Sequence, residues 1–394
     1  MPTPPFVRDR ITILSYGAVG AYAYYLYALG PVLAFLHREL DISYTLTSLH
    51  SALWAGGTVL TGLVFGSLVR RFGRRGVLWA SVAGTAGGAL LFSVSHHVGL
   101  TLLATGLLGI AGSLVQTATT VILADRHGGW RERALVEGGV MAAAAAVLAP
   151  VVLGSLDRTN FGWRAGMLLP VLALGALWLV FRHDRLPAAP ATPVSGVSGV
   201  GSGRLPRQYW PLAILVAVVV GIEFSMVLYG AVLLDDDRGF STASAATAMS
   251  VFYVGILSGR IAGAGLTRRA GRITLLLLCA LATTTAGFTV FWLSTFSAVA
   301  IVGLFLVGLG VANLYPLTVA LAVARAPGQT DQAAARTQLL IGVAVIAAPL
   351  TLGALADEIG VFRAFAVEPV LIAVAMFLLL VSSRAAQPRE AARL

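Results

Sequence analysis

The 394-residue chain is 58% apolar and only 11% charged, and its mean hydropathy is +0.87. Soluble globular proteins carry about 25% charged residues, so this chain has too few charges to cover a water-exposed surface, and we predict a polytopic membrane protein. Its net charge of +10 does not indicate nucleic-acid binding, because the arginines are spread over the segments between long apolar stretches. With a single cysteine, the chain forms neither an intramolecular disulfide nor a cysteine-based metal site.

Twelve apolar stretches along the chain are long enough to cross a bilayer core as helices. All exceed the roughly 9–11 residues of a membrane β-strand, and they lack the alternation of polar and apolar residues found in such strands. In the first half, the predicted spans cover residues 11–36, 44–69, 77–95, 99–124, 134–156 and 163–181. In the second half, they cover residues 210–234, 241–266, 273–294, 297–324, 333–356 and 362–381.

A segment rich in Pro, Gly and Ser separates the two groups of six spans and predicts a linker at 186–209. We therefore expect one six-helix bundle at 1–185 and another at 210–394. The bundles are sequence repeats, since LVRRFGR at 68–74 recurs as LTRRAGR at 266–272, and APVVLGSL at 149–156 recurs as APLTLGAL at 348–355. Six spans return the chain to its starting side, so the repeats are predicted to be parallel.

Arginine supplies every basic residue of the chain, and 21 of the 27 arginines fall before the first span, after the last one, or in alternate loops between spans. This asymmetry follows the positive-inside rule and predicts that both termini and the central linker are cytoplasmic. The first apolar stretch is followed by many others, so it is not expected to be a cleaved signal.

The stretch GSLVRRFGRR at 66–75, between the second and third spans, is similar to the loop G-x-L-x-D-R-x-G-R-R of the major facilitator superfamily. Together with twelve spans in two parallel sixes, it makes the whole chain resemble that family of secondary transporters. Arg70 stands where the family has an Asp that latches one conformation, so the usual latch is in doubt. Two roles remain open for this predicted gating loop and its repeat, namely gating, or topology with lipid anchoring. Its residues are Gly66, Arg70, Arg71, Gly73, Arg74, Arg268, Arg269 and Gly271.

Glu223 is the one acid that falls deep inside a predicted span. A charge at the bilayer centre costs at least about 2.5 kcal/mol, so a buried acid in that place indicates a function. The resemblance implies that the seventh helix lines a central cavity, and we predict that Glu223 is a proton-coupling site. The alternative is a protonated, hydrogen-bonded helix spacer. Glu368 and His50 lie nearer the outer ends of their spans, where snorkelling or hydrogen bonding at the interface is expected.

Aromatic and neutral polar groups within the helices that the resemblance places around the cavity form the predicted substrate site. Such groups suit an amphipathic organic solute, although each one can also simply join two helices. The predicted substrate-binding residues are Tyr27, Trp54, Gln116, Asn313, Tyr315 and Gln338.

We predict a secondary active transporter in a bacterial plasma (inner) membrane, a monomer that moves a small organic solute by alternating access with proton coupling. Export is preferred only because it is common in the family. The residues of this chain give it no support, since the two family signatures of export are degraded at Thr105 and at Ala149. A uniporter or exchanger, or an uptake symporter, with a structural Glu223 is the alternative within transport. A membrane sensor or enzyme is the alternative from another class, against which stands the lack of Walker, HExxH, CxxC and GxSxG motifs. No cofactor and no metal are expected.

Overall fold

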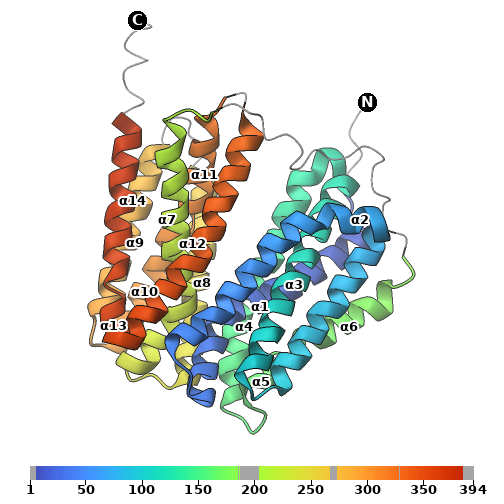
Figure 1. Cartoon of the computed structure of the whole chain (residues 1–394), viewed down its shortest axis with the longest axis horizontal. Coiled ribbons are helices and arrows are strands. Elements are labelled where there is room, and N and C mark those ends of the chain that lie inside the picture. Colours follow the sequence, from blue (N-terminus) through green and yellow to red (C-terminus); the bar gives the residue numbers. More distant parts are fainter. Residues whose placement is uncertain (1–5, 185, 187–203, 267–272, 328, 385–394) are drawn as a thin grey trace, which may run out of the picture. The chain divides into compact units, whose positions relative to one another are not determined.

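The computed structural model describes residues 6–184, 186, 204–266, 273–327 and 329–384, and every regular element within those ranges is a helix (Figure 1). In the first half these are α1 (Arg10–Leu40), α2 (Tyr44–Val94), α3 (Val98–His127), the single 3-10 turn η1 (Gly128–Trp130), α4 (Arg131–Asp157), α5 (Gly162–Gly166) and α6 (Leu169–Phe181). In the second half they are α7 (Tyr209–Asp237), α8 (Thr242–Leu266), α9 (Ile273–Leu293), α10 (Ser297–Val311), α11 (Leu314–Ala324), α12 (Thr330–Ile359), α13 (Val361–Ala364) and α14 (Val367–Arg384).

Eleven helical segments of the described residues are long and apolar enough to cross a membrane, and the difference from the predicted twelve lies in α2. This 51-residue element contains both the second and the third predicted span, and its helical dihedrals are broken at Gly73, where φ is 70° and ψ is 163°. Only glycine adopts a positive φ of this kind without strain. Gly73 therefore lets the chain turn back between two spans, and the reversal within α2 is visible in Figure 1.

Prolines explain three further breaks. The last predicted span of each half is divided into a short and a long helix, α5 with α6 and α13 with α14, and each long helix has a proline near its start, Pro170 and Pro369. Likewise, the predicted span 297–324 is interrupted between α10 and α11, just before Pro316. A proline lacks the N–H that would continue the helix and its ring clashes with the preceding turn, so it favours a helix start, although Pro31, Pro150 and Pro349 lie inside α1, α4 and α12.

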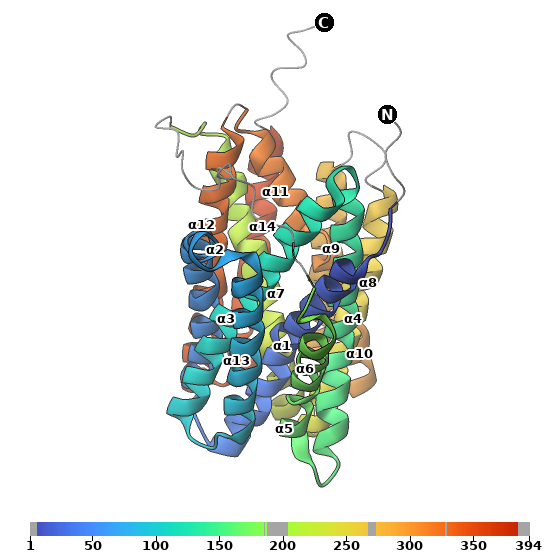
Figure 2. The same ribbon diagram turned by 90° about the vertical axis from the view of Figure 1, so that its right-hand side faces the viewer.

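Contacts divide the chain into two compact units, residues Met1–Thr192 with Ser241–Ser250, and residues Pro193–Phe240 with Val251–Leu394. In the first unit, α1 packs against α3, α4 and α6 (Figure 2). In the second unit, α7 packs against α11, α12 and α14. These helices are related by the sequence repeat, so both halves use one packing scheme. The predicted linker falls mostly on residues that the structure does not describe, and its bounds stay a prediction.

The first unit buries one apolar face of α1 against α2, α3 and α6. Leu14, Leu78, Ile122 and Leu174 are each at most 1% exposed in this core. Where α2 meets α3, the close approach depends on glycine, because a Cβ placed on Gly109 would lie 2.6 Å from the backbone oxygen of Trp54. Small residues of this kind allow membrane helices to pack closely, which compensates for the weak hydrophobic drive between helices in lipid.

Replacing Gly109 with Leu is expected to prevent normal packing of α3 on α2, because the added side chain meets the Trp54 backbone rather than a movable side chain. The expected result is a large loss of folded protein in detergent, measured by size-exclusion chromatography and thermal unfolding. Gly106→Leu on the same helix is the matched control, since nothing lies within 4 Å of its added Cβ. Equal yields of the two variants would contradict the packing role.

Candidate substrate and proton site

Glu223 lies at the middle of α7, fourteen residues from each end of the helix, and is half-buried. The positive charge of Arg260 on α8 acts on its carboxyl group, and Glu223 in turn acts on the phenol of Tyr315 on α11. No ion pair within 4.0 Å is recorded between Glu223 and Arg260 among the described residues, so the guanidinium stands near the carboxyl group without clamping it. The three groups form a polar cluster, which we call the Glu223 cluster.

Apolar surroundings and Arg260 act on the Glu223 carboxyl in opposite directions. Removal from water favours the neutral acid, whereas the nearby guanidinium favours the carboxylate. Protonation of Glu223 would change the net charge of the cluster by one.

The other candidate substrate residues of the second unit differ in exposure and in hydrogen bonding. Tyr315 is 39% exposed and Gln338 on α12 is exposed, so both side chains can be reached by a solute. Asn313 donates a hydrogen bond from Nδ2 to the backbone oxygen of Gly259 at 2.6 Å, and its amide lies against Gly263 of the same helix. That contact joins the α10–α11 break to α8, and it already engages the amide nitrogen.

Glu368 was expected to snorkel or to form a hydrogen bond near the outer end of its span, and its burial argues against snorkelling. In the second residue of α14 its side chain is wholly buried, at 0% exposure. Ser225 of α7 faces its carboxyl group, but neither carboxyl oxygen makes a hydrogen bond of normal geometry within the described ranges. Burial of a carboxylate without a hydrogen-bond partner is costly, so a neutral acid is expected at Glu368.

In the first unit, Trp54 lies beside a small polar cluster that the sequence did not reveal. The Tyr22 hydroxyl on α1 interacts with Ser113 on α3, and the Ser113 hydroxyl lies 2.7 Å from that of Thr58 on α2. The Tyr22 ring centroid is 6.3 Å from that of Trp54, whose side chain is only 5% exposed. The sequence contained one indication of this cluster, because Thr58 lies one helical turn after Trp54 and therefore falls on the same face of α2.

Tyr27 and Gln116 are half-buried, so they remain candidates for contact with a solute. His50 was expected to snorkel or to form a hydrogen bond near the outer end of its span, and its side chain is 0% exposed and lies between two helices. Its Nε2 lies 2.9 Å from the Thr101 hydroxyl on α3, and its Nδ1 lies 3.0 Å from the backbone oxygen of Leu46. His50 therefore holds α2 to α3 rather than facing the headgroups.

In the predicted gating loop, two of the four arginines contact a neighbouring part of the chain among the described residues. Arg70 donates to Ser67 on its own helix at 3.0 Å, and Arg71 lies over the ring of Phe72. Arg74, by contrast, pairs with Asp125 near the end of α3 at 2.5 Å, and only 6% of its side chain is exposed.

Arg75 donates to the backbone oxygen of Arg182 after α6. The second half of α2 is thus tied to α3 and α6 by Arg74 and Arg75. Gly66 lies exposed within α2. The repeat positions Arg268, Arg269 and Gly271 lie outside the described residues.

Sequence comparison decides the family of the chain. It matches the model of the Major Facilitator Superfamily over residues 15–335 and again over residues 213–393. The chain belongs to the major facilitator superfamily. The second match starts within the second unit, in keeping with the internal repeat. No curated protein matches the chain significantly.

Solved structures of major facilitator transporters share the fold. A peptide transporter POT in complex with sulfate is 14% identical, with a TM-score of 0.77 over 98% of this chain and 96% of that one. The nucleoside transporter NupG is 12% identical, with a TM-score of 0.73 over 96% and 99% of the two chains. A bacterial homolog of the human lysosomal transporter Spinster, in an inward-facing and unoccupied conformation, is 14% identical, with a TM-score of 0.71 over 95% and 96%.

These findings confirm the predicted family and fold class, an all-α membrane protein of major facilitator architecture. As a major facilitator protein, the chain is a multi-pass secondary transporter of small molecules. At identities this low, the neighbours show the fold but not the solute.

Proposed function

We propose that this major facilitator protein exports a small amphipathic organic solute in exchange for protons, and that Glu223 is its proton-binding residue. The observation that carries the proposal is the Glu223 cluster. A half-buried carboxyl group at the centre of α7 lies within electrostatic reach of Arg260 and Tyr315. Binding of a proton converts a balanced pair of charges into a single positive charge on Arg260. If the two conformations of the transport cycle solvate this charge differently, protonation changes their relative populations.

The residues proposed for the solute offer aromatic faces and neutral hydrogen-bonding groups rather than several fixed charges. They are Tyr27, Trp54 and Gln116 in the first unit, and Asn313, Tyr315 and Gln338 in the second. An uncharged or singly charged solute with an apolar body suits such groups. Export is preferred over uptake on family grounds alone.

We also propose that the protein lies in a bacterial inner membrane as a monomer with both termini in the cytoplasm. The support is the arginine asymmetry, with 21 of 27 arginines at the termini or in alternate loops. Reporter fusions near Ser195 and after the last helix should both report a cytoplasmic position. A periplasmic signal from either fusion would reverse the orientation.

The transport proposal is tested in proteoliposomes that contain a pH-sensitive dye. Solutes that raise the melting temperature of the purified protein are selected first, because ligands of the folded state stabilise it. An imposed pH difference should then drive accumulation of the selected solute, and addition of solute should move protons. If Glu223 and Arg260 instead form a fixed ion pair, flux should be indifferent to pH, and the protein would be a uniporter or an exchanger.

A further inference from the structure

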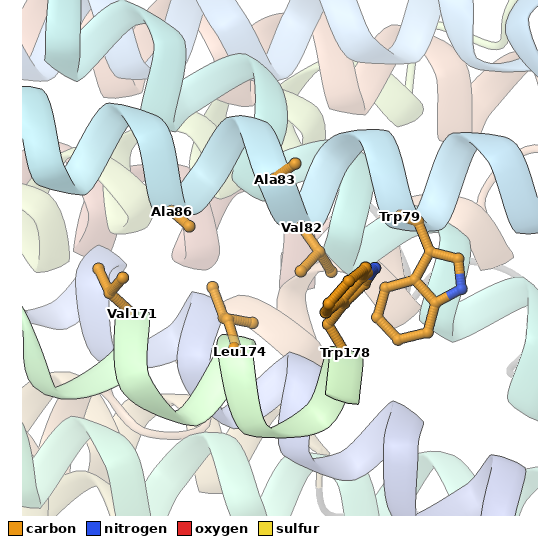
Figure 3. A pocket seen from close by; sticks show the side chains of 8 residues that line it. Trp79, Val82, Ala83, Ala86, Val171, Leu174 and Trp178 are labelled. Carbon is orange, nitrogen blue, oxygen red and sulfur yellow. The ribbon is translucent and has the colours of Figure 1, made fainter. Parts of the chain in front are cut away.

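The surface of the first unit carries an apolar groove that has no part in the proposed transport site. The groove lies between the second half of α2 and α6 and has a cavity volume of about 270 Å³ (Figure 3). Eight residues form its walls, almost entirely with apolar atoms, namely Trp79, Val82, Ala83, Ala86, Val171, Leu174, Gly175 and Trp178.

The rest of the described chain leaves this groove uncovered. Ala83 and Gly175 are exposed, and Trp178 is 44% exposed. Among the described residues, no charged, amide or hydroxyl side chain lines the groove, whereas sites for polar solutes place a few polar groups in an apolar pocket of about 300–1,000 Å³. An elongated apolar ligand therefore fits the groove better than a polar transported solute does.

Both tryptophans of the groove lie at the same end, away from Ala86 and Val171 (Figure 3). Basic groups continue beyond that end. The guanidinium of Arg182 lies over the Trp178 ring, 5.0 Å from its centroid, and Arg75, one helical turn before Trp79, donates to the backbone oxygen of Arg182. Both arginine side chains are exposed. The nearby carboxylate of Asp184 is engaged by Arg10 at 2.9 Å, so it leaves the charge of Arg182 available.

We propose that this groove binds one acyl chain of an anionic phospholipid, whose headgroup is held by Arg75 and Arg182. The order along the groove, from apolar wall through two tryptophans to two arginines, matches the order of a phospholipid from acyl chain through interface to phosphate. Basic pockets at the ends of membrane helices attract anionic headgroups, at about 1 kcal/mol for each arginine near the surface. A zwitterionic lipid offers the same chain without the net charge.

The test compares phosphatidylglycerol with phosphatidylcholine, each added to the full-length protein in neutral detergent. Phosphatidylglycerol should raise the melting temperature by several degrees more than phosphatidylcholine does. Gly175→Leu should abolish this difference by filling the groove, because nothing lies within 4 Å of an added Cβ there. Gly87→Leu, on an exposed part of α2 with the same free space, should keep the difference.

A second pair of variants tests the headgroup. Arg182→Gln should at least halve the preference for phosphatidylglycerol while keeping the backbone oxygen that Arg75 contacts. Arg71→Gln, an exposed arginine of the same loop, should behave like the parent. Phosphatidylglycerol with brominated acyl chains should also quench tryptophan fluorescence less in Trp178→Phe than in the parent. Equal stabilisation by the two lipids, or an unchanged preference in Gly175→Leu, would overturn the proposal and indicate a general bilayer effect.

Discussion

Glu223→Gln is expected to abolish accumulation of solute driven by a pH difference, while exchange of labelled for unlabelled solute continues at a rate within a few-fold of the parent. Glutamine has the shape of the protonated acid but does not titrate, so the Glu223 cluster keeps one charge state at every pH. The two conformations then remain accessible, but the proton gradient no longer biases them. Accumulation and exchange are measured in the same proteoliposomes, with and without an imposed pH difference.

Glu368→Gln is the matched control, because Glu368 is also a membrane carboxyl group on the second unit but has no charged group acting on it within the described ranges. If Glu368 holds its proton permanently, its amide variant should accumulate solute like the parent. Full accumulation by Glu223→Gln would refute the coupling assignment. Loss of accumulation in Glu368→Gln alone would show that the proton binds on the α14 side of α7.

Asp125→Ala is expected to destabilise the protein more than Arg74→Ala does, although the two residues share one ion pair. The Arg74 side chain is 6% exposed, whereas that of Asp125 is 37% exposed. Removing Asp125 strands a buried guanidinium, and loss of one partner of a buried pair costs about 3–5 kcal/mol. Removing Arg74 leaves a carboxylate that water can reach, so the expected loss of stability is about 1 kcal/mol or less, as for exposed ion pairs.

Thermal unfolding in detergent measures these effects, and solute exchange in proteoliposomes shows whether the pair also serves the transport cycle. Arg70→Ala should stay within about 0.5 kcal/mol of the parent, as is usual for surface changes, because Arg70 contacts only its own helix. The double variant Arg74→Ala with Asp125→Ala should be more stable than Asp125→Ala alone, since it removes the stranded charge. An Arg70→Ala variant that folds normally but fails to transport would give the loop a gating role instead.

In the predicted gating loop, an ion pair that the sequence did not predict lies close to the position where the family's acid is missing. Arg70 replaces the family's acid, and the sequence therefore put the latch in doubt. The structure supplies another ionic contact at this end of α2, from Arg74 to Asp125 on the neighbouring α3. Asp125 lies 51 residues away in the chain, so no local pattern connects the two.

The sequence by itself determined the membrane class, the repeat and the family. These properties depend on composition and on local periodicity, because an apolar stretch of about 20 residues must form its hydrogen bonds within a helix when it crosses lipid. The position of Glu223 as the central acid of α7 followed from the same local pattern. The breaks near Pro170, Pro316 and Pro369 did not, because the sequence predicted continuous spans at 163–181, 297–324 and 362–381.

Only the tertiary structure decided which polar groups are neighbours. The charge of Arg260 acts on Glu223 from another helix, and the side chain of Glu368 is fully buried in the packed interior. His50 likewise lies within hydrogen-bond distance of Thr101 on the neighbouring helix. The rotation of each helix about its axis is set by close packing against its neighbours, through contacts such as that of Gly109 with Trp54. A hydropathy pattern that is apolar all around a helix carries little information about that rotation.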